Sequence, residues 1–195
     1  MIAAPVLFLC PFKAEATLLL SILPECKAKN SQHWQFKGGE IITWNGSGPE
    51  KMSAAMNSFI GLHNFSRLVL FGSAGALDPD LKPGQIFSAS SVKLADRQIK
   101  LPCLQGFAAA TALTNTRPVF AADERLELFS RSGCQLVDME SFFFVEKFHR
   151  SEQQVSVLRF ISDTAELTFK LPFAKEIQQQ VLHSRKMLLT IMNDS

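Results

Sequence analysis

The chain has 195 residues, of which 47% are apolar and 19% are charged, and its formal net charge is +2. This balance is typical of a folded globular protein and excludes a disordered one, and the length suits one domain with a large core. Lysines and arginines are scattered, with no run that would follow a phosphate backbone, so we expect no nucleic-acid partner.

The cysteines and the N-terminal segment bear on the cellular compartment. Cys10, Cys26, Cys103 and Cys134 lie far apart with no C-x-x-C pair, which predicts reduced thiols in a cytoplasmic protein and neither a zinc site nor a disulfide framework. Residues 2–9 form an apolar run without a preceding basic region, so we interpret them as a buried strand and not as a signal peptide. No stretch is long enough to span a bilayer, and we expect no membrane partner.

The first half of the chain alternates strand and helix patterns. After the strand at 2–9, residues 11–24 have apolar side chains at helical spacing between two prolines. Apolar segments on both sides of Gly38-Gly39 predict a hairpin. A helix that begins at Pro49 would place five apolar residues on one face, namely Met52, Ala55, Met56, Phe59 and Ile60.

The second half continues this alternation. Residues 68–71 predict a short strand that ends in the loop Gly72-Ser73-Ala74-Gly75, and residues 86–94 predict another strand, whereas 95–118 show no clear pattern. We expect a short helix capped by Asp123 and ended by Gly133, a strand at 136–137, a helix over 142–148 and a strand over 155–161. One long C-terminal helix is predicted from Pro172, with four residues facing inward: Phe173, Ile177, Val181 and Leu188.

These elements predict the fold class. Strands that alternate with amphipathic helices indicate a three-layer α/β/α fold with a mixed, mostly parallel central sheet. The hairpin signal argues against a simple open Rossmann sheet.

Acidic residues follow several of the predicted strands. Ligands of open α/β folds bind beyond the carboxyl ends of the strands, and this rule selects Glu15, the 72–75 loop, Asp138, Glu140 and the Ser162-Asp163 pair. Each has an ordinary structural interpretation as a tight turn, a helix cap or a first-turn acid. Their coincidence at successive strand ends predicts an acid/base site.

Five segments, in order over residues 11–166, resemble motifs of the nucleoside phosphorylase and nucleosidase superfamily, and within it the methylthioadenosine/S-adenosylhomocysteine nucleosidases. Residues 11–19 (PFKAEATLL) are similar to the family's first strand–helix junction with its water-handling Glu, and 46–51 (GSGPEK) to its G-x-G-K segment with one residue inserted. Residues 72–77 (GSAGAL), 137–141 (VDMES) and 159–166 (RFISDTAE) resemble its G-S-A-G-G-L, V-E-M-E-A and R-A-I-S-D-x-A-D motifs. The resemblance implies a nucleoside phosphorylase-like fold in a single nucleosidase domain over 1–195.

The chemistry of glycosidic cleavage, together with this resemblance, assigns candidate roles. Asp163, held by Ser162, would protonate N7 of the leaving purine, a general-acid step that contributes about 10²–10⁴-fold; for this, Asp163 should be desolvated or beside another acid. Glu140 would accept the 2′ and 3′ hydroxyls while Met139 packs on the sugar, and Glu15 would deprotonate the attacking water. The resemblance adds Arg159 and Ser73 as assistants of Glu15, and further substrate contacts at Ala74, Gly75, Asp138, Val119 and Phe120.

Two features of the sequence bear on the reaction. Missing phosphate-binding arginines bear on whether water or phosphate accepts the ribosyl group, and the acid at position 163 bears on which purine is released. A phosphorylase needs arginines for phosphate, but related phosphorylases have an Arg before the glycine loop where residues 68–71 read LVLF, and their early phosphate loop is absent from 10–20. Water is therefore expected as the acceptor, with no metal or cofactor. Futalosine hydrolases tend to have Asn at the position of Asp163, so the acid here favours adenine.

We therefore predict release of adenine from 5′-substituted adenosines, either methylthioadenosine and S-adenosylhomocysteine of methionine salvage or aminodeoxyfutalosine of menaquinone biosynthesis. A purine nucleoside phosphorylase and a non-catalytic nucleoside-binding protein stay as alternatives. The resemblance implies a homodimer, for which the apolar faces of 52–60 and 142–148 are candidates, although both also fit an ordinary core. Because the segment between Val92 and Leu136 is shorter than in larger nucleosidases, the preferred 5′ group stays open.

Overall fold

The structure is a computed structural model that describes residues 5–58, 64–165 and 168–191. Its ten described strands form one sheet in the order β10-β6-β8-β9-β5-β1-β4-β3-β2, with β7 paired to β6. They are β1 Val6–Cys10, β2 Lys27–Asn30, β3 His33–Phe36, β4 Gly39–Thr43, β5 Arg67–Ala76, β6 Ile86–Leu94, β7 Arg97–Lys100, β8 Ala108–Thr114, β9 Leu136–Asp138 and β10 Gln154–Asp163. Both parallel and antiparallel pairs occur, which confirms the predicted mixed sheet.

The sheet closes on itself at its centre. Strand β5 pairs with β1 and β10 in parallel and with β9 in antiparallel orientation, while β10 also pairs with β6. Strands β5, β9, β8, β6 and β10 therefore form a ring, and β1, β4, β3 and β2 extend it on one side. This curvature brings the carboxyl ends of β5, β8, β9 and β10 near one another.

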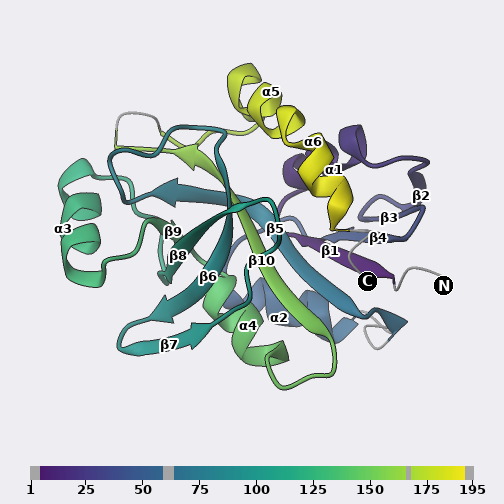
Figure 1. The fold of residues 1–195 in the computed structure, drawn as a ribbon, viewed down its shortest axis with the longest axis horizontal. Helices are drawn as coiled ribbons and strands as arrows, with labels where there is room; N and C mark the ends of the chain where they lie inside the picture. The colour runs from purple at the N-terminus through teal and green to yellow at the C-terminus, as the bar shows by residue number, and fades with distance from the viewer. Residues whose placement is uncertain (1–4, 59–63, 166–167, 192–195) are drawn as a thin grey trace.

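Helices cover both faces of the sheet (Figure 1). They are α1 Lys13–Ile22, α2 Pro49–Ser58, α3 Ala122–Ser132, α4 Ser141–Phe148, α5 Lys175–His183 and α6 Arg185–Thr190. Helices α1, α5 and α6 lie on one side, α2 and α4 on the other, and α3 at the edge of the molecule beside β8 and β9. The three-layer arrangement predicted from the alternating pattern is confirmed.

The burial of β1 explains why its sequence is apolar throughout. Val6, Phe8 and Cys10 join the hydrophobic cluster under α1, α5 and α6, whereas Leu7 and Leu9 join the cluster under α2 and α4. All five side chains are buried, and each large apolar side chain of this kind stabilises the fold by about 1.5–3 kcal/mol. The strand is therefore covered on both faces, as its apolar run predicts.

Several predicted elements are confirmed in detail. The strand at 86–94 has the expected bounds, β3 and β4 form the hairpin around Gly38, and α2 begins at Pro49 with Met52 and Met56 buried. Helix α3 ends at Gly133, which adopts the left-handed conformation with φ of 65°. Phe59 and Ile60, like the first residues of the predicted N-terminal strand, lie outside the described residues.

The predicted loop at 72–75 is wrong, because β5 continues through it to Ala76. Gly72 and Ser73 pair in register with Arg159 and Phe160 of β10, and this pairing keeps the glycine-rich segment extended. Beyond it, the segment pairs with β9. The family-like motif is therefore a strand whose small residues leave room for neighbouring side chains.

The structure corrects two further expectations at helix ends and contains three strands that the sequence did not predict. Asp123 is not the cap of α3, since Ala121 occupies that position and Asp123 accepts the N–H of Glu124 within the first turn. The C-terminal helix does not begin at Pro172 and is interrupted at Ser184, although its four inward residues are buried as expected. Strands β2, β7 and β8 have no counterpart in the prediction. No helix among the described residues is both long and apolar enough to cross a membrane.

Candidate functional site

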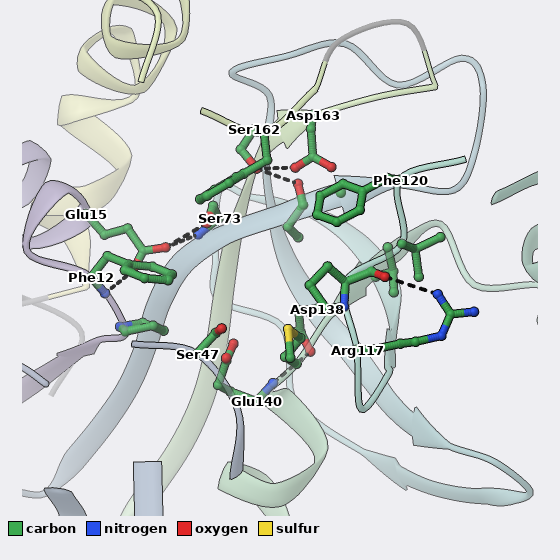
Figure 2. A pocket seen from close by; sticks show the side chains of 18 residues that line it. Phe12, Glu15, Ser47, Ser73, Arg117, Phe120, Asp138, Glu140, Ser162 and Asp163 are labelled. Carbon is green, nitrogen blue, oxygen red and sulfur yellow. Dashed lines mark hydrogen bonds between the residues drawn. The ribbon is translucent and has the colours of Figure 1, made fainter. Parts of the chain in front are cut away.

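A cavity lies at the carboxyl ends of the strands, with about 650 Å³ of space free of protein atoms when its open mouth is included. All the predicted site residues except Arg159 line it: Glu15, Ser73, Ala74, Gly75, Val119, Phe120, Asp138, Met139, Glu140, Ser162 and Asp163. Figure 2 shows the carboxyl groups of Glu15, Glu140 and Asp163 on three sides of one space.

Glu15 is held rigidly at the start of α1. It is 1% exposed, and its Oε2 accepts the backbone N–H of Phe12 at 2.8 Å, which ties it to the beginning of its own helix. Its Oε1 accepts the backbone N–H and the hydroxyl of Ser73, both at 2.7 Å. The junction between β1 and α1 therefore positions this carboxyl against β5, where it is almost fully shielded from bulk solvent.

Arg159 lies beneath the cavity and does not line it, so the expected direct contact with the cavity is not seen. Its side chain is fully buried; Nε donates to Asp138 Oδ2 at 2.8 Å and Nη2 lies 3.4 Å from Glu140 Oε2. Its Nη1 has no hydrogen-bond partner among the described residues. A Cβ built on Gly72 would lie 2.6 Å from this Nη1 and 2.9 Å from Glu15 Oε1, so the unpaired donor and the carboxyl both lie against the same glycine.

Asp138 supports this arginine and the start of α4. Its Oδ1 accepts Thr114 Oγ1 at 3.0 Å and the backbone N–H of Ser141 at 3.1 Å, while Oδ2 accepts both the Ser141 hydroxyl and Arg159 Nε. Both carboxyl oxygens are thus occupied by protein donors. Asp138 is suited to orienting Arg159, and less suited to binding a ligand.

Glu140 faces the cavity at the end of β9. It is 4% exposed, and its Oε1 accepts the backbone N–H of Gly48 at 2.7 Å from the loop that follows β4. Met139 lines the cavity beside it. The glycine-rich segment at 46–48 therefore holds this carboxylate from outside the ring of strands.

The charges around Arg159 are unequal in number. Burial raises the pKa of Glu15, against the opposing effect of its hydrogen bonds with Ser73 and Phe12. Burial also raises the pKa of Glu140 to about 7, since Arg159 offsets only part of that effect. Burial disfavours the charged form of Arg159, but Asp138, Glu140 and Glu15 outweigh this and raise its pKa. Burial is thus the main cause of both raised pKa values, and the single cation among these three acids offsets it only in part.

Asp163 has a different environment at the end of β10. It is 7% exposed, which meets the expectation of desolvation, but its Oδ2 pairs with Arg125 of α3 and not with a second acid. Its Oδ1 accepts the Ser162 hydroxyl at 2.5 Å. Ser162 also contacts the Ala74 carbonyl at 3.3 Å, as the dashed lines in Figure 2 indicate.

The loop after β8 forms the remaining wall. Val119 is buried and Phe120 is 58% exposed, and both of these predicted substrate contacts line the cavity. The sequence did not indicate seven further lining residues: Pro11, Phe12, Ser47, Arg117, Pro118, Val137 and Phe169. Three aromatic rings, those of Phe12, Phe120 and Phe169, therefore line a cavity whose wall also includes four acidic residues.

Sequence reasoning missed Arg125, Ser141 and the Gly48 backbone. Arg125 reads as one more charge on a charged helix, although it precedes Leu128 by three residues, and these two are the buried side chains of α3. A charged residue on the apolar face of an amphipathic helix is the signal that was available. Its partner, 38 residues further along the chain, was not predictable from local pattern.

Comparisons with solved structures give the fold a context. The 5′-methylthioadenosine/S-adenosyl homocysteine nucleosidase of Campylobacter jejuni aligns with a TM-score of 0.75 and 16% identity over 98% of this chain and 99% of that chain. A futalosine hydrolase mutant of Helicobacter pylori aligns with a TM-score of 0.73 and 17% identity over 98% and 100%. The S-adenosylhomocysteine nucleosidase of Streptococcus pyogenes, in complex with 5-methylthiotubericidin, aligns with a TM-score of 0.75 and 16% identity over 100% and 99%.

These likenesses show the fold. No protein-family model matches the sequence, and no curated protein matches it. At this low identity, the full coverage in both directions establishes that the chain has the α/β architecture of these structures and spans their whole length. The resemblance inferred from five short motifs is confirmed at the level of the fold.

Proposed function

We propose that this protein is a nucleosidase that hydrolyses the N-glycosidic bond of 5′-substituted adenosines and releases adenine. The observation that carries the proposal is the meeting of Glu15, Glu140 and Asp163 around one cavity, from three elements far apart in the sequence. Cleavage of this bond builds positive charge on the ribose and negative charge on the purine. Separate acids for the base, the sugar and the attacking water are what such a reaction needs.

At the base, Asp163 is the proposed general acid toward N7. Its carboxyl is nearly enclosed, and Ser162 fixes one of its oxygens, so its direction is set before a ligand enters. Phe120 offers a ring on which a purine can stack. An acid at this position also accepts a hydrogen bond from an exocyclic amine, which supports adenine as the leaving group.

At the sugar, Glu140 is the proposed acceptor for the 2′ and 3′ hydroxyls. The Gly48 N–H uses one lone pair of Oε1 and leaves others for a cis-diol. Met139 supplies an apolar surface for the ribose. In this proposal Asp138 does not contact the substrate. Its hydrogen bond with Arg159 orients that side chain beneath Glu140.

At the nucleophile, Glu15 is the proposed base. Its raised pKa makes it a better proton acceptor for water, and Ser73 fixes the carboxyl from the strand side. The unpaired Nη1 of Arg159 is a fully buried donor beside this carboxyl, and a buried donor without a partner is costly unless a ligand or water satisfies it. This arrangement supports a water site between Glu15, Arg159 and Ser73.

Water is the proposed acceptor in preference to phosphate because of the charge at that end of the cavity. Among the described lining residues, the nucleophile end has Glu15 with Pro11, Phe12, Ser47 and Ser73, and the cation that lines the cavity, Arg117, belongs to the opposite wall and pairs with Glu124. A dianion placed beside Glu15 would meet a buried carboxyl, and the nearby Arg159 is already shared with Asp138 and Glu140. Phosphorolysis stays the second candidate, and binding without turnover the third.

The 5′ group and the assembly stay predictions. Methylthioadenosine, S-adenosylhomocysteine and aminodeoxyfutalosine remain the candidate substrates, and the similar structures include nucleosidases for the first two compounds and a futalosine hydrolase. Phe12 and Phe169, whose ring centroids are 6.2 Å apart, offer an apolar contact for a 5′ substituent. The homodimer, the single-domain organisation and the cytoplasmic location inferred from the sequence are retained as predictions.

The decisive experiment measures adenine release from these three compounds and from adenosine, with and without phosphate. We expect turnover without phosphate and a fall in kcat of about 10²–10⁴-fold in Glu15→Ala and in Asp163→Ala. Glu152→Gln, an exposed acid in the turn before β10, serves as the control and should keep full activity. A requirement for phosphate with release of ribose 1-phosphate would favour the phosphorylase, and tight adenine binding without turnover would favour the binding protein.

A further inference from the structure

A fully buried arginine lies directly behind the base end of the cavity. Arg125 is 1% exposed and is among the largest side chains with so little exposure. It does not line the cavity itself, whereas its partner Asp163 does. A buried guanidinium outside the ligand space is costly to maintain, and its contact with a lining carboxyl indicates a role at that carboxyl.

Its guanidinium joins three segments that form the base end of the site. Nη1 donates to the Ala76 carbonyl at 2.9 Å at the end of β5, and Nη2 donates to the Val119 carbonyl at 2.7 Å in the wall after β8. Nη2 also pairs with Asp163 Oδ2 at the end of β10. One planar fork thus sets the relative positions of the carboxyl, the β5 end and the wall, which a lysine ammonium cannot do in the same geometry.

The local backbone makes room for this pair. A Cβ built on Gly75 would lie 2.7 Å from Arg125 Nη1 and 3.0 Å from Asp163 Oδ2. Any larger residue at position 75 would therefore displace the guanidinium, the carboxyl or both. The absence of a side chain at Gly75 therefore leaves the space that the Arg125–Asp163 ion pair occupies.

We propose that Arg125 is a positioning residue for the acid step: it fixes the Asp163 carboxyl and stabilises the carboxylate that remains when the proton has passed to the purine. This inference rests on the proposed function. In the step, the Asp163 proton moves to N7, the electrons of the C1′–N9 bond move to the purine, and water adds to C1′ and yields its proton to Glu15. The two carboxyls then exchange a proton through solvent to restore the starting state.

The effect is electrostatic and directional. A fixed cation at Oδ2 stabilises the negative charge that develops on this carboxyl as its proton passes to the purine. Because Arg125 is already in place and desolvated, no reorganisation is needed as the charge forms. The other charged groups that line this cavity are Arg117 from the wall, Asp138 and Glu140 after β9, and Glu15 from α1, and none of them is recorded in hydrogen-bond or ion-pair contact with the described Asp163 carboxyl.

A double-mutant cycle on kcat tests the proposal, with saturating methylthioadenosine or whichever compound of the panel the wild type cleaves. We expect Arg125→Met to lower kcat about 10²-fold and Asp163→Asn about 10³-fold, while the double variant stays within about threefold of Asp163→Asn because the arginine acts through the acid. Arg125→Lys should recover part of the loss, since it keeps the charge but not the fork. Arg131→Met, an exposed arginine on the same helix, is the matched control.

Gly75→Ala tests the same pair in a second way, because it crowds Arg125 and Asp163 without replacing either of them. We expect it to lower kcat in the wild-type background and to have little further effect in Asp163→Asn. Losses that multiply in the cycle, or full activity in Arg125→Met, would overturn the role of Arg125. A wild-type protein that releases no adenine from any compound would instead contradict the proposed function, so the two failures are distinguishable.

Discussion

Two buried arginines flank the cavity, and they serve different numbers of acids. Beneath the sugar and nucleophile end, Arg159 contacts Asp138 and Glu140 and influences Glu15. Behind the base end, Arg125 pairs with Asp163 alone. The first cluster has more carboxyls than guanidinium groups, and burial raises the pKa of two of these carboxyls, whereas the second cluster is a one-to-one pair.

This difference matches the chemistry proposed for each end. A base for water and an acceptor for a diol benefit from carboxyls that bind protons readily, and both Glu15 and Glu140 have raised pKa values. At the base end, Arg125 is in place to stabilise the carboxylate that forms when Asp163 gives up its proton. The same fold therefore places one guanidinium near three acids at one end of the cavity and one guanidinium against a single acid at the other.

The largest expected effect concerns the stability of the balanced pair. Arg125→Met leaves the buried Asp163 without its cation, and breaking a buried pair from one side costs about 3–5 kcal/mol. We expect a loss of about 3 kcal/mol in the free energy of unfolding, measured by urea denaturation at neutral pH. Arg125→Met combined with Asp163→Asn should recover most of this loss, because no buried charge is left unpaired.

The exposed pair of Arg117 and Glu124 provides the matched control. Arg117 has a side chain 66% exposed, so Arg117→Met should change the free energy of unfolding by less than about 1 kcal/mol. Equal losses in Arg117→Met and Arg125→Met would mean that the buried pair is no more important to the fold than a surface one.

The next effect separates the two ends through the glycines of β5. Gly72→Ala would place a Cβ 2.6 Å from Arg159 Nη1 and Gly75→Ala one 2.7 Å from Arg125 Nη1. Crowding of this kind costs about 1–3 kcal/mol of stability. We expect Gly75→Ala to weaken the binding of free adenine, measured by calorimetry, and Gly72→Ala to leave adenine affinity unchanged while it lowers kcat.

Each glycine variant is the control for the other, and their melting temperatures report any general loss of structure. If both variants lose adenine affinity to the same degree, the division of the cavity into a base end and a nucleophile end is wrong.

The extent to which the sequence predicts this site differs between the same two ends. Glu15, Glu140 and Arg159 lie within short motifs next to strands of clear pattern, so local reasoning could find them. Arg125 lies on a helix whose buried face consists of itself and Leu128. It follows a segment that showed no clear pattern, because the alanines of β8 at 108–110 have no strong strand preference.

Contacts between distant segments were beyond local pattern altogether. The continuation of β5 through Gly72 and Gly75 depends on pairing with β10 and β9, which the glycines themselves disfavour. The break of the C-terminal helix at Ser184 was also not predictable, because no proline or glycine lies at that position. For β5 the deciding partners lie elsewhere in the chain, where periodicity provides no information.

The smallest expected effect is a pH dependence confined to the acid-rich end. Burial raises the pKa of Glu140 to about 7, so the acceptor carboxylate prevails above that pH and is lost as the pH falls through it. A protonated carboxyl has fewer lone pairs for the ribose hydroxyls. The affinity for a non-cleavable C-nucleoside, in which carbon replaces the glycosidic nitrogen, should therefore fall about tenfold from pH 8 to pH 6.

Two controls assign this dependence to the sugar end. Glu140→Gln should bind the C-nucleoside weakly at both pH values, because it cannot titrate, and free adenine, which has no ribose, should show a smaller dependence in the wild type. If Glu140→Gln kept the full tenfold change, the titrating group would lie elsewhere and Glu140 would not be the sugar acceptor. If adenine alone showed the same change, the dependence would belong to the base end, and the contrast between three acids on one arginine and one acid on the other would not govern binding.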